Sequence, residues 1–187
     1  MEISPFLERK LARRFRTFDF DDDGDIDRAD FERSAAAVAD EFDHPPDSAA
    51  RLRLLELSLA LWDHLARSAD ADADGAITVE EYKHAFAGGL LVTEDSFDQG
   101  YRPFLDALMD VCDTDGDGRL DAEEHVRWTG ALMNLPEDDA REIHRRLDED
   151  GDGFVTTEDL LTAIHDFYFD EDPEGTGSWL LGPLDDD

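Results

Sequence analysis

Residues 113–124 read DTDGDGRLDAEE, and this twelve-residue pattern decides the fold because it recurs three more times in the chain. The other copies are DFDDDGDIDRAD at 19–30, DADADGAITVEE at 70–81 and DEDGDGFVTTED at 148–159. Every copy has aspartate at positions 1, 3 and 5, glycine at position 6 and an aliphatic residue at position 8. Four matches in the same register indicate one repeated structural unit.

The spacing of oxygen-bearing residues in this pattern suits a calcium ion. Calcium takes six to eight oxygen ligands, which a twelve-residue loop supplies from positions 1, 3, 5, 7, 9 and 12, with position 7 using its backbone carbonyl. Glycine at position 6 allows the sharp turn. The predicted ligands are Asp19, Asp21, Asp23, Asp25, Asp27 and Asp30 in loop 1 (19–30); Asp70, Asp72, Asp74, Ala76, Thr78 and Glu81 in loop 2 (70–81); Asp113, Asp115, Asp117, Arg119, Asp121 and Glu124 in loop 3 (113–124); and Asp148, Asp150, Asp152, Phe154, Thr156 and Asp159 in loop 4 (148–159).

Position 12 separates the loops into two classes. Loops 2 and 3 end in Glu81 and Glu124, which are long enough to bind calcium through both carboxylate oxygens. Loops 1 and 4 end in Asp30 and Asp159, which are shorter by one methylene group. A ligand that binds through one oxygen lowers the coordination number towards the octahedral preference of magnesium. We therefore expect up to four calcium ions, with weaker calcium binding or magnesium tolerance at loops 1 and 4.

The charge of the chain also favours cations as partners. Fifty acidic residues outnumber seventeen basic ones, and the formal net charge is −33. Of the acidic residues, 24 lie inside the four loops, whereas a merely solvated acidic surface would spread them evenly. A charge of this sign repels nucleic acid and anionic membranes, so neither is an expected partner.

Helical patterns flank all four loops. Apolar residues recur at three- and four-residue spacing before and after each loop, as in amphipathic helices. The aliphatic residue at position 8 is expected to pair in a short strand with the partner loop. These features predict an all-α fold in which four helix-loop-helix units form two paired lobes of one compact body. The expected division is a first pair over 1–88, a linker over 89–98, a second pair over 99–169 and a tail over 170–187.

Two segments outside the loops leave alternatives open. The tail carries Trp179, Leu180, Leu181 and Leu184 beside acidic residues, and we expect these apolar side chains to dock on the body. The alternatives are a disordered tail or a peptide that binds a partner. The helix before loop 1 carries the basic residues Arg9, Lys10, Arg13, Arg14 and Arg16. They either offset the repulsion among the carboxylates of loop 1 or form a solvated helix face.

The four loops resemble those of the EF-hand superfamily. Their first aspartates lie at 19, 70, 113 and 148, and the long first interval resembles the sarcoplasmic calcium-binding proteins and their bacterial relative calerythrin. The ending DPEGTGSWLLGP at 172–183 is also similar to the calerythrin-type C-terminus. The resemblance implies two EF-hand pairs, 1 with 2 and 3 with 4, that act as a calcium buffer or signal modulator. In that family the second loop is often degenerate, whereas here it is complete, which indicates four working sites.

Two other functions are alternatives to a calcium buffer. A calcium sensor exposes an apolar groove that is often rich in methionine, whereas this chain has three methionines. A photoprotein-like luciferin binder would use buried His, Trp and Tyr residues. The candidates for that role are Trp62, Trp128, His165 and Tyr168, which we interpret as ordinary core or surface positions. No motif calls for an enzyme active site.

The single cysteine, Cys112, excludes an internal disulfide and fits a reducing compartment. Residues 1–16 carry charges throughout, and no apolar run approaches the ~20 residues of a membrane span. The expectation is a cytoplasmic monomer whose protein partner, if it has one, is unknown.

Overall fold

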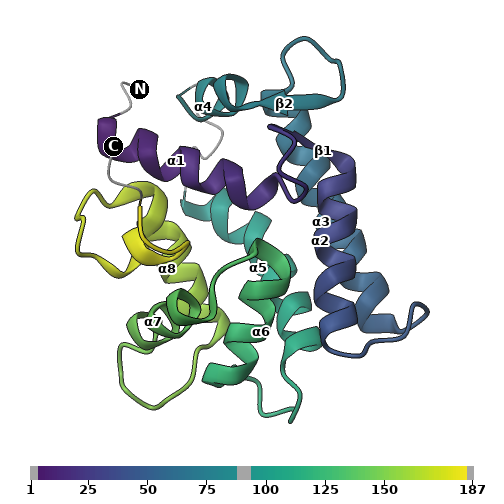
Figure 1. Ribbon diagram of the computed structural model, residues 1–187, viewed down its shortest axis with the longest axis vertical. Helices are drawn as coiled ribbons and strands as arrows, with labels where there is room; N and C mark the ends of the chain where they lie inside the picture. Colours follow the sequence, from purple (N-terminus) through teal and green to yellow (C-terminus); the bar gives the residue numbers. More distant parts are fainter. Residues whose placement is uncertain (1–3, 88–93, 185–187) are drawn as a thin grey trace.

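The computed structural model describes residues 4–87 and 94–184, and that part of the chain is mostly helical (Figure 1). The all-α fold predicted from the sequence is confirmed. None of the described helices is long and apolar enough to cross a membrane. In chain order the elements are α1 (Pro5–Phe18), β1 (Asp25–Asp27), α2 (Arg28–Glu41), α3 (Ala49–Ala69), β2 (Ala76–Thr78), α4 (Val79–Ala87), α5 (Glu94–Cys112), α6 (Ala122–Met133), α7 (Glu137–Leu147), α8 (Thr157–Phe169) and the 3₁₀ helix η1 (Thr176–Trp179).

The loop pattern itself starts each second helix. Position 9 of the loop is the N-cap of the following helix, and position 12 is the third helical residue. In loop 3, for example, the Asp121 side chain accepts from the Glu124 N–H at 2.9 Å, and Glu124 accepts from the Asp121 N–H at 3.1 Å. This reciprocal capping box satisfies two N–H groups that a helix start leaves without partners. The same reciprocal bonds join Asp27 with Asp30 and Thr156 with Asp159.

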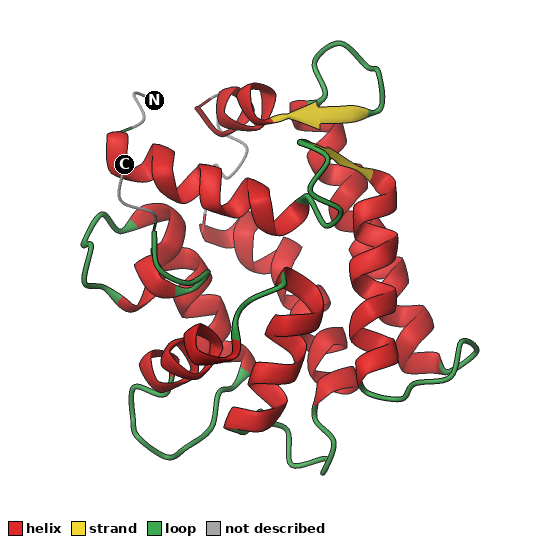
Figure 2. Cartoon of the chain, in the orientation of Figure 1, coloured by secondary structure: helices red, strands yellow, loops and turns green. Residues whose placement is uncertain are grey.

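The loops are joined in pairs through position 8. Strands β1 and β2 form an antiparallel pair in which Ile26 faces Ile77 (Figure 2). Loops 3 and 4 meet through an antiparallel bridge between Leu120 and Val155, whose two N–H···O bonds are 2.8 and 2.9 Å long. All four side chains are fully buried. Pairing of loop 1 with loop 2 and of loop 3 with loop 4 is therefore observed as predicted.

The two pairs share one hydrophobic core. Buried residues from α1 to α8 and from the tail form a single cluster. Helix α2 packs on α6, and α3 packs on α5, so elements of the first pair cover elements of the second. Arg127 of α6 crosses the junction and pairs with the Glu41 carboxylate of α2 at 2.9 Å. The body is thus continuous across the two EF-hand-like halves.

Helix α5 differs from its predicted extent. The sequence places the second pair from residue 99 onwards, after a linker over 89–98, but the helix starts at Glu94 and continues through Pro103. A proline lacks an N–H group and is best tolerated in the first helical turn, which is why the sequence favours a later start. Residues 94–98 of the expected linker are therefore helical. The rest of that linker, from 89 to 93, lies outside the described residues.

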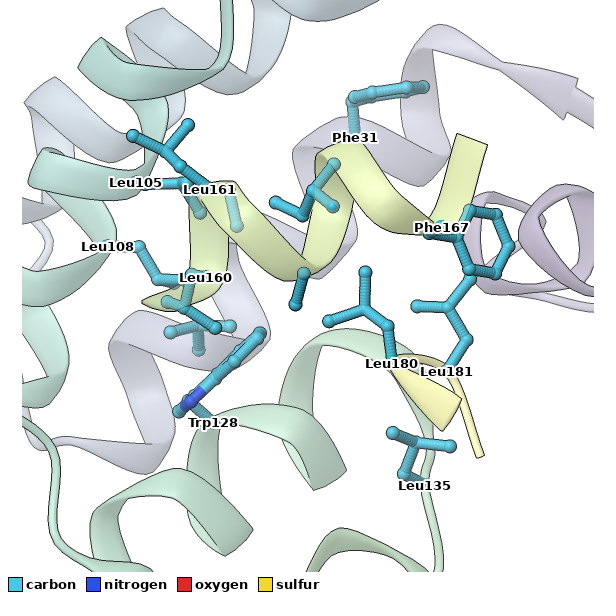
Figure 3. Close-up of a cluster of buried hydrophobic side chains, with 14 of the residues drawn as sticks. Phe31, Leu105, Leu108, Trp128, Leu135, Leu160, Leu161, Phe167, Leu180 and Leu181 are labelled. Atoms are coloured by element: carbon cyan, nitrogen blue, oxygen red, sulfur yellow. The ribbon is translucent and has the colours of Figure 1, made fainter. Parts of the chain in front are cut away.

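The end of the described chain packs on the body. Leu180 and Leu181 are 7% and 2% exposed, and they lie beside Phe167 of α8 and Leu135 (Figure 3). The tail is also tied to α1 through polar contacts. Lys10 Nζ donates to the Asp170 carbonyl at 2.7 Å, and Arg13 Nε donates to the Leu181 carbonyl at 2.7 Å.

These contacts give Lys10 and Arg13 a role that neither interpretation of the basic helix before loop 1 included. Lys10 is fully buried, and burial lowers its pKa to about 8, against the opposing pull of Asp170 and Glu171. Arg14 stacks on the Phe18 ring, with 4.2 Å between the guanidinium carbon and the ring centre. Lys10 and Arg13 hold the tail, which sequence periodicity alone could not show because the contacts join residues more than 150 positions apart.

A buried histidine pair lies beneath loops 3 and 4. The fully buried His125 ring meets the Trp128 and His144 rings edge-on, with centroids 5.4 and 5.3 Å away. Neither ring nitrogen of His125 has a hydrogen-bond partner within the described residues. Burial, and secondly the neighbouring charge of His144, lowers the pKa of His125 to about 3. His125 directly follows position 12 of loop 3, and the structure makes it a buried titratable group.

Replacing His125 with leucine should reduce the decrease in the free energy of unfolding that occurs as the pH falls. The unfolded chain takes up this proton near pH 6.5 and the folded chain only near pH 3. The stabilisation is therefore complete above pH 6.5 and is lost as the pH falls towards 3, by about 1.4 kcal/mol per pH unit. Urea unfolding of wild type and His125→Leu between these pH values measures the difference. The exposed His64→Gln is the matched control, and equal acid loss in wild type and His125→Leu contradicts the prediction.

Candidate metal sites

Each of the four loops brings three carboxylates together. One oxygen from each member lies within 4.8 Å of the others, and the cluster lies where the loop folds back on itself. The clusters are Asp19, Asp21 and Asp30 in loop 1; Asp70, Asp72 and Glu81 in loop 2; Asp113, Asp115 and Glu124 in loop 3; and Asp148, Asp150 and Asp152 in loop 4. Positions 1 and 3 take part in every cluster, whereas position 12 takes part in three and position 5 in one.

The aspartate at position 1 closes each loop on the glycine at position 6. In loop 3, Asp113 Oδ2 accepts from the Gly118 N–H at 2.7 Å, and the bond recurs at 2.9 to 3.1 Å in the other loops. The four glycines have φ between 84° and 98°, a left-handed conformation that other residues rarely adopt. The repeated Asp and Gly therefore produce the same local turn four times.

The carboxylate at position 12 bridges the two ends of the loop in three cases. Glu81 accepts from the N–H at position 2 at 3.1 Å and from the N–H at position 9 at 3.0 Å. The corresponding distances are 2.7 and 3.1 Å for Glu124, and 3.2 and 2.8 Å for Asp30. Asp159 accepts from the Thr156 N–H at 2.8 Å and from its hydroxyl at 2.7 Å. No bond from Asp159 to position 2 is found within residues 4–87 and 94–184.

Loops 1 and 4 therefore differ, although the sequence treats them alike. Asp30 accepts from the N–H groups of Phe20 and Asp27, so it spans its loop in spite of its shorter side chain. Asp159 stays at its helix start, and the loop 4 cluster uses Asp152 instead. Asp30 thus makes the same two backbone contacts as a glutamate at position 12, whereas Asp159 does not reach position 2.

The other predicted ligands lie in the same loops but outside the three-carboxylate clusters. At position 5, one oxygen each of Asp23, Asp74 and Asp117 accepts from the N–H at position 7 at 2.9 or 3.0 Å. Position 9 acts as the helix N-cap. The residues outside the clusters are Asp23, Asp25, Asp27, Asp74, Ala76, Thr78, Asp117, Arg119, Asp121, Phe154, Thr156 and Asp159.

Loop 1 carries two buried carboxylates, whose charged forms are disfavoured by desolvation. Asp19 is 7% exposed and Asp30 is 2% exposed, and desolvation raises the pKa of both carboxyls. In loop 2, hydrogen bonds from the Thr78 N–H and hydroxyl lower the pKa of Glu81. Burial favours a higher pKa for Asp113 in loop 3, but hydrogen bonds from the N–H groups of the loop outweigh it and lower the pKa. A divalent cation would relieve the desolvated pair in loop 1 most.

The side-chain contacts of two arginines with loop carboxylates were not predicted from the sequence. Arg33, in α2, pairs with the Asp21 carboxylate and has Nη1 3.8 Å from Asp30 Oδ1. Arg119 contacts Asp117 and Asp152, although its predicted role used only its backbone carbonyl. Arg33 lies outside the twelve-residue pattern, so the pattern carries no signal for it.

The donor set fits a hard divalent cation. Every cluster consists of carboxylate oxygens, which calcium and magnesium prefer, and none contains the histidine or cysteine that softer metals prefer. The single cysteine, Cys112, is buried and belongs to none of the four clusters.

Comparison with known proteins agrees with this geometry. Residues 8–87 match the family model for an EF-hand domain pair, and residues 105–124 match the model for an EF hand. Calerythrin from Saccharopolyspora erythraea is 32% identical over 161 residues, covering 86% of this chain and 90% of that protein. The beta chain of a sarcoplasmic calcium-binding protein from Penaeus sp. is 26% identical, covering 89% of this chain and 90% of that protein.

Solved structures give the same result. A Streptomyces coelicolor calcium-binding protein, described in terms of prokaryotic calcium-mediated regulation, has a TM-score of 0.78 and 36% identity, covering 94% of this chain and 98% of that chain. A coelenterazine-binding protein from Renilla muelleri has a TM-score of 0.73 at 23% identity, covering 97% of this chain and 100% of that chain, which shows likeness of fold alone. The resemblance expected from the loop spacing is confirmed.

Proposed function

Because this chain belongs to the EF-hand family of calcium-binding proteins, among the relatives of calerythrin, we propose that it is a calcium buffer or signal modulator that binds calcium at four loops. The four carboxylate clusters supply the ligands. The observation that carries the buffer role is the packing of the tail, whose Leu180 and Leu181 lie in the same hydrophobic core as residues of both EF-hand pairs. Apolar surface that the tail itself covers is not available to a partner.

The rest of the surface also supports a buffer. Among the described residues, Leu52 and Phe169 are the large apolar side chains that are exposed. Met109 is buried in α5, so it does not offer a flexible methionine surface. The second candidate is a calcium sensor, and it is favoured by the Streptomyces relative that is described in terms of calcium-mediated regulation.

A calcium titration with a fluorescent probe of apolar surface separates these two functions. Calorimetry of the full chain counts the ions bound, and ANS fluorescence at each step reports exposed apolar surface. A buffer binds calcium with little change in ANS fluorescence. A several-fold rise in ANS fluorescence on calcium loading would replace the buffer with the sensor, and no heat of binding would contradict both.

Magnesium binding is proposed for loops 1 and 4, with the larger effect in loop 4. There, Asp159 leaves position 12 out of the carboxylate cluster, so Asp159→Glu should restore a long ligand and raise calcium selectivity over magnesium about tenfold, in line with the effect of ligand changes on metal affinity. Asp30 already spans loop 1, so Asp30→Glu should change selectivity less. Calorimetric calcium titrations with and without magnesium measure both. Equal selectivity in wild type and both variants contradicts the proposal.

The luciferin-binding alternative is not favoured by the geometry of the candidates. Trp62 packs on Phe31, with 5.7 Å between ring centroids, while Trp128 packs on His125. Among the described residues, a cavity lined by Arg14, Phe31, Phe104 and neighbouring residues has a volume of about 40 Å³. Such a volume holds about two or three water molecules, so this cavity gives no support for a luciferin site.

We further infer that the protein is a cytoplasmic monomer without enzymatic activity. The free, buried Cys112 is compatible with a reducing compartment. The net charge of −33 disfavours nucleic acid and anionic membranes as partners. The relatives that cover most of this chain are calcium-binding proteins rather than enzymes.

A further inference from the structure

Arg14 of α1 carries a positive charge into the junction of the two EF-hand pairs. Its guanidinium carbon lies 4.2 Å from the centre of the Phe18 ring, and the guanidinium donates a hydrogen bond to the Tyr101 hydroxyl. The Nε atom is buried and has no hydrogen-bond partner within the described residues. Because arginine stays protonated in proteins, burial does not remove this charge as it can for lysine or histidine.

The groups that face this guanidinium are neutral. They are the hydroxyls of Tyr82, Tyr101 and Tyr168, and burial raises the pKa of each, so all three are uncharged at neutral pH. No carboxylate forms an ion pair with Arg14 in residues 4–87 and 94–184, although the chain has fifty acidic residues. A buried charge without a counter-charge is unfavourable, so an anion that reaches this guanidinium is stabilised there.

Arg14 also lines the cavity of about 40 Å³ described above. The walls of this cavity come from α1, α2, α3, α5 and α6, which belong to both EF-hand pairs (Figure 1). Part of the Arg14 side chain remains accessible, so a small solute can reach it. The apolar part of the wall consists of Phe18, Phe31, Leu61, Phe104, Leu132 and Met133. The cavity therefore has one positively charged side and one apolar side.

Three hydroxyl groups complete the wall, and all three donate to backbone carbonyls. Thr17 Oγ1 donates to the Arg14 carbonyl at 2.8 Å. Ser58 Oγ and Ser34 Oγ both donate to the Phe31 carbonyl, at 3.0 and 3.4 Å. The hydroxyl hydrogens are thus engaged within the protein. The guanidinium of Arg14 is the donor that this wall keeps for a ligand.

From this arrangement we propose that the cavity binds a small monocarboxylate, an anion of the size of acetate. A carboxylate presents two oxygens, which suit the planar guanidinium, and the methyl group of acetate suits the apolar side of the cavity. A volume that holds about two or three water molecules admits about three or four non-hydrogen atoms. The ligand would contact helices of both EF-hand pairs. This site is separate from the four loops and does not depend on the proposed calcium binding.

Methionine methyl groups provide the test, because Met133 lines the cavity whereas Met109 is buried and does not line it. The calcium-loaded full chain, with isotope-labelled methionine methyl groups, is titrated with sodium acetate and followed by NMR. Sodium chloride at equal ionic strength is the control. The Met133 signal should shift and saturate with a Kd on the order of 1 mM, as expected for so few ligand atoms. The Met109 signal should stay in place.

Two variants remove the site in different ways. Arg14→Gln removes the charge and should weaken acetate binding about ten- to hundredfold, the effect of losing a hydrogen bond to a charged group. Ser34→Leu keeps Arg14 but fills the cavity, so it should also abolish the Met133 shift, and it provides the test if Arg14→Gln does not fold. Arg53→Gln removes an exposed positive charge that pairs with Glu56, so it should bind acetate as the wild type does.

Several results would overturn the inference. They are a Met133 signal that does not respond to acetate, equal shifts of Met109 and Met133, and an equal response to chloride. Acetate binding that persists in both Arg14→Gln and Ser34→Leu would do the same. None of these results bears on calcium binding by the four loops, which calorimetry counts, so failure of this inference is distinguishable from failure of the proposed function.

Discussion

Removing calcium with a chelator is expected to lower the free energy of unfolding by several kcal/mol, the largest effect that we predict. An ion that binds only the folded chain stabilises it by about 2.7 kcal/mol per site when its concentration is a hundred times Kd. The loops also hold clustered carboxylates in a chain of net charge −33, and these repel one another without a counter-ion. Each site should therefore add several degrees to Tm, measured by calorimetry with and without chelator.

Salt and a single-loop variant test the origin of this loss. Potassium chloride at about 1 M shortens the screening length to about 3 Å, so it should recover part of the lost stability by screening repulsion between loops. It should not recover the part that comes from direct coordination. Glu124→Gln removes a predicted ligand of loop 3, so it should lower the stabilisation by calcium by the contribution of one site. An unchanged Tm on chelation would contradict calcium-linked folding.

Replacing Gly177 with alanine is expected to destabilise the protein by about 1–3 kcal/mol, the usual cost of overpacking. A Cβ at this position would lie 2.5 Å from backbone atoms of Asp166 and Phe167 in α8. Backbone of a packed helix cannot move aside as a flexible side chain can, so the tail has to shift. Leu180 and Leu181 follow within four residues and should leave the core with it, which raises ANS fluorescence.

Gly130 offers a matched control in α6. A Cβ there would meet only the Leu135 carbonyl oxygen at 3.9 Å, an ordinary contact. Alanine is the better helix former, so Gly130→Ala should be neutral or stabilise the chain by up to about 1 kcal/mol. Urea unfolding and ANS fluorescence of both variants check the prediction. Equal stability of Gly177→Ala and wild type would show that the tail is not held as tightly as its contacts indicate.

The repeated pattern predicts most of the local structure because its requirements are local. Aspartate at position 1 and glycine at position 6 form a turn between residues five positions apart, such as Asp113 and Gly118. Positions 9 and 12 form a capping box between residues three positions apart, such as Asp121 and Glu124. Bonds over such short separations depend on the identity of the residues and little on the rest of the chain. The loops, the helix starts and the clusters of positions 1 and 3 follow from them.

The predictions that were wrong or incomplete concern distant partners. The residues preceding loop 1 do not indicate that Lys10 binds the Asp170 carbonyl, because nothing near Lys10 in the sequence differs from a solvated helix face. Asp30 and Asp159 are identical residues at the same loop position. They differ in whether the carboxylate reaches the N–H at position 2, and nothing in the twelve-residue pattern distinguishes the two cases.

The sequence by itself therefore determines four loops of cation-binding type, their helices and their likeness to calerythrin, because each loop is specified by residues within twelve positions. Only the tertiary structure decides how these units act together. It buries His125 against His144, docks the tail through Lys10 and Arg13, and sets Arg119 between the carboxylates of two loops. Apart from the contact of Arg119 with Asp117 in its own loop, these contacts join residues that are far apart in the chain, and burial and charge act on them only after the core has brought them together.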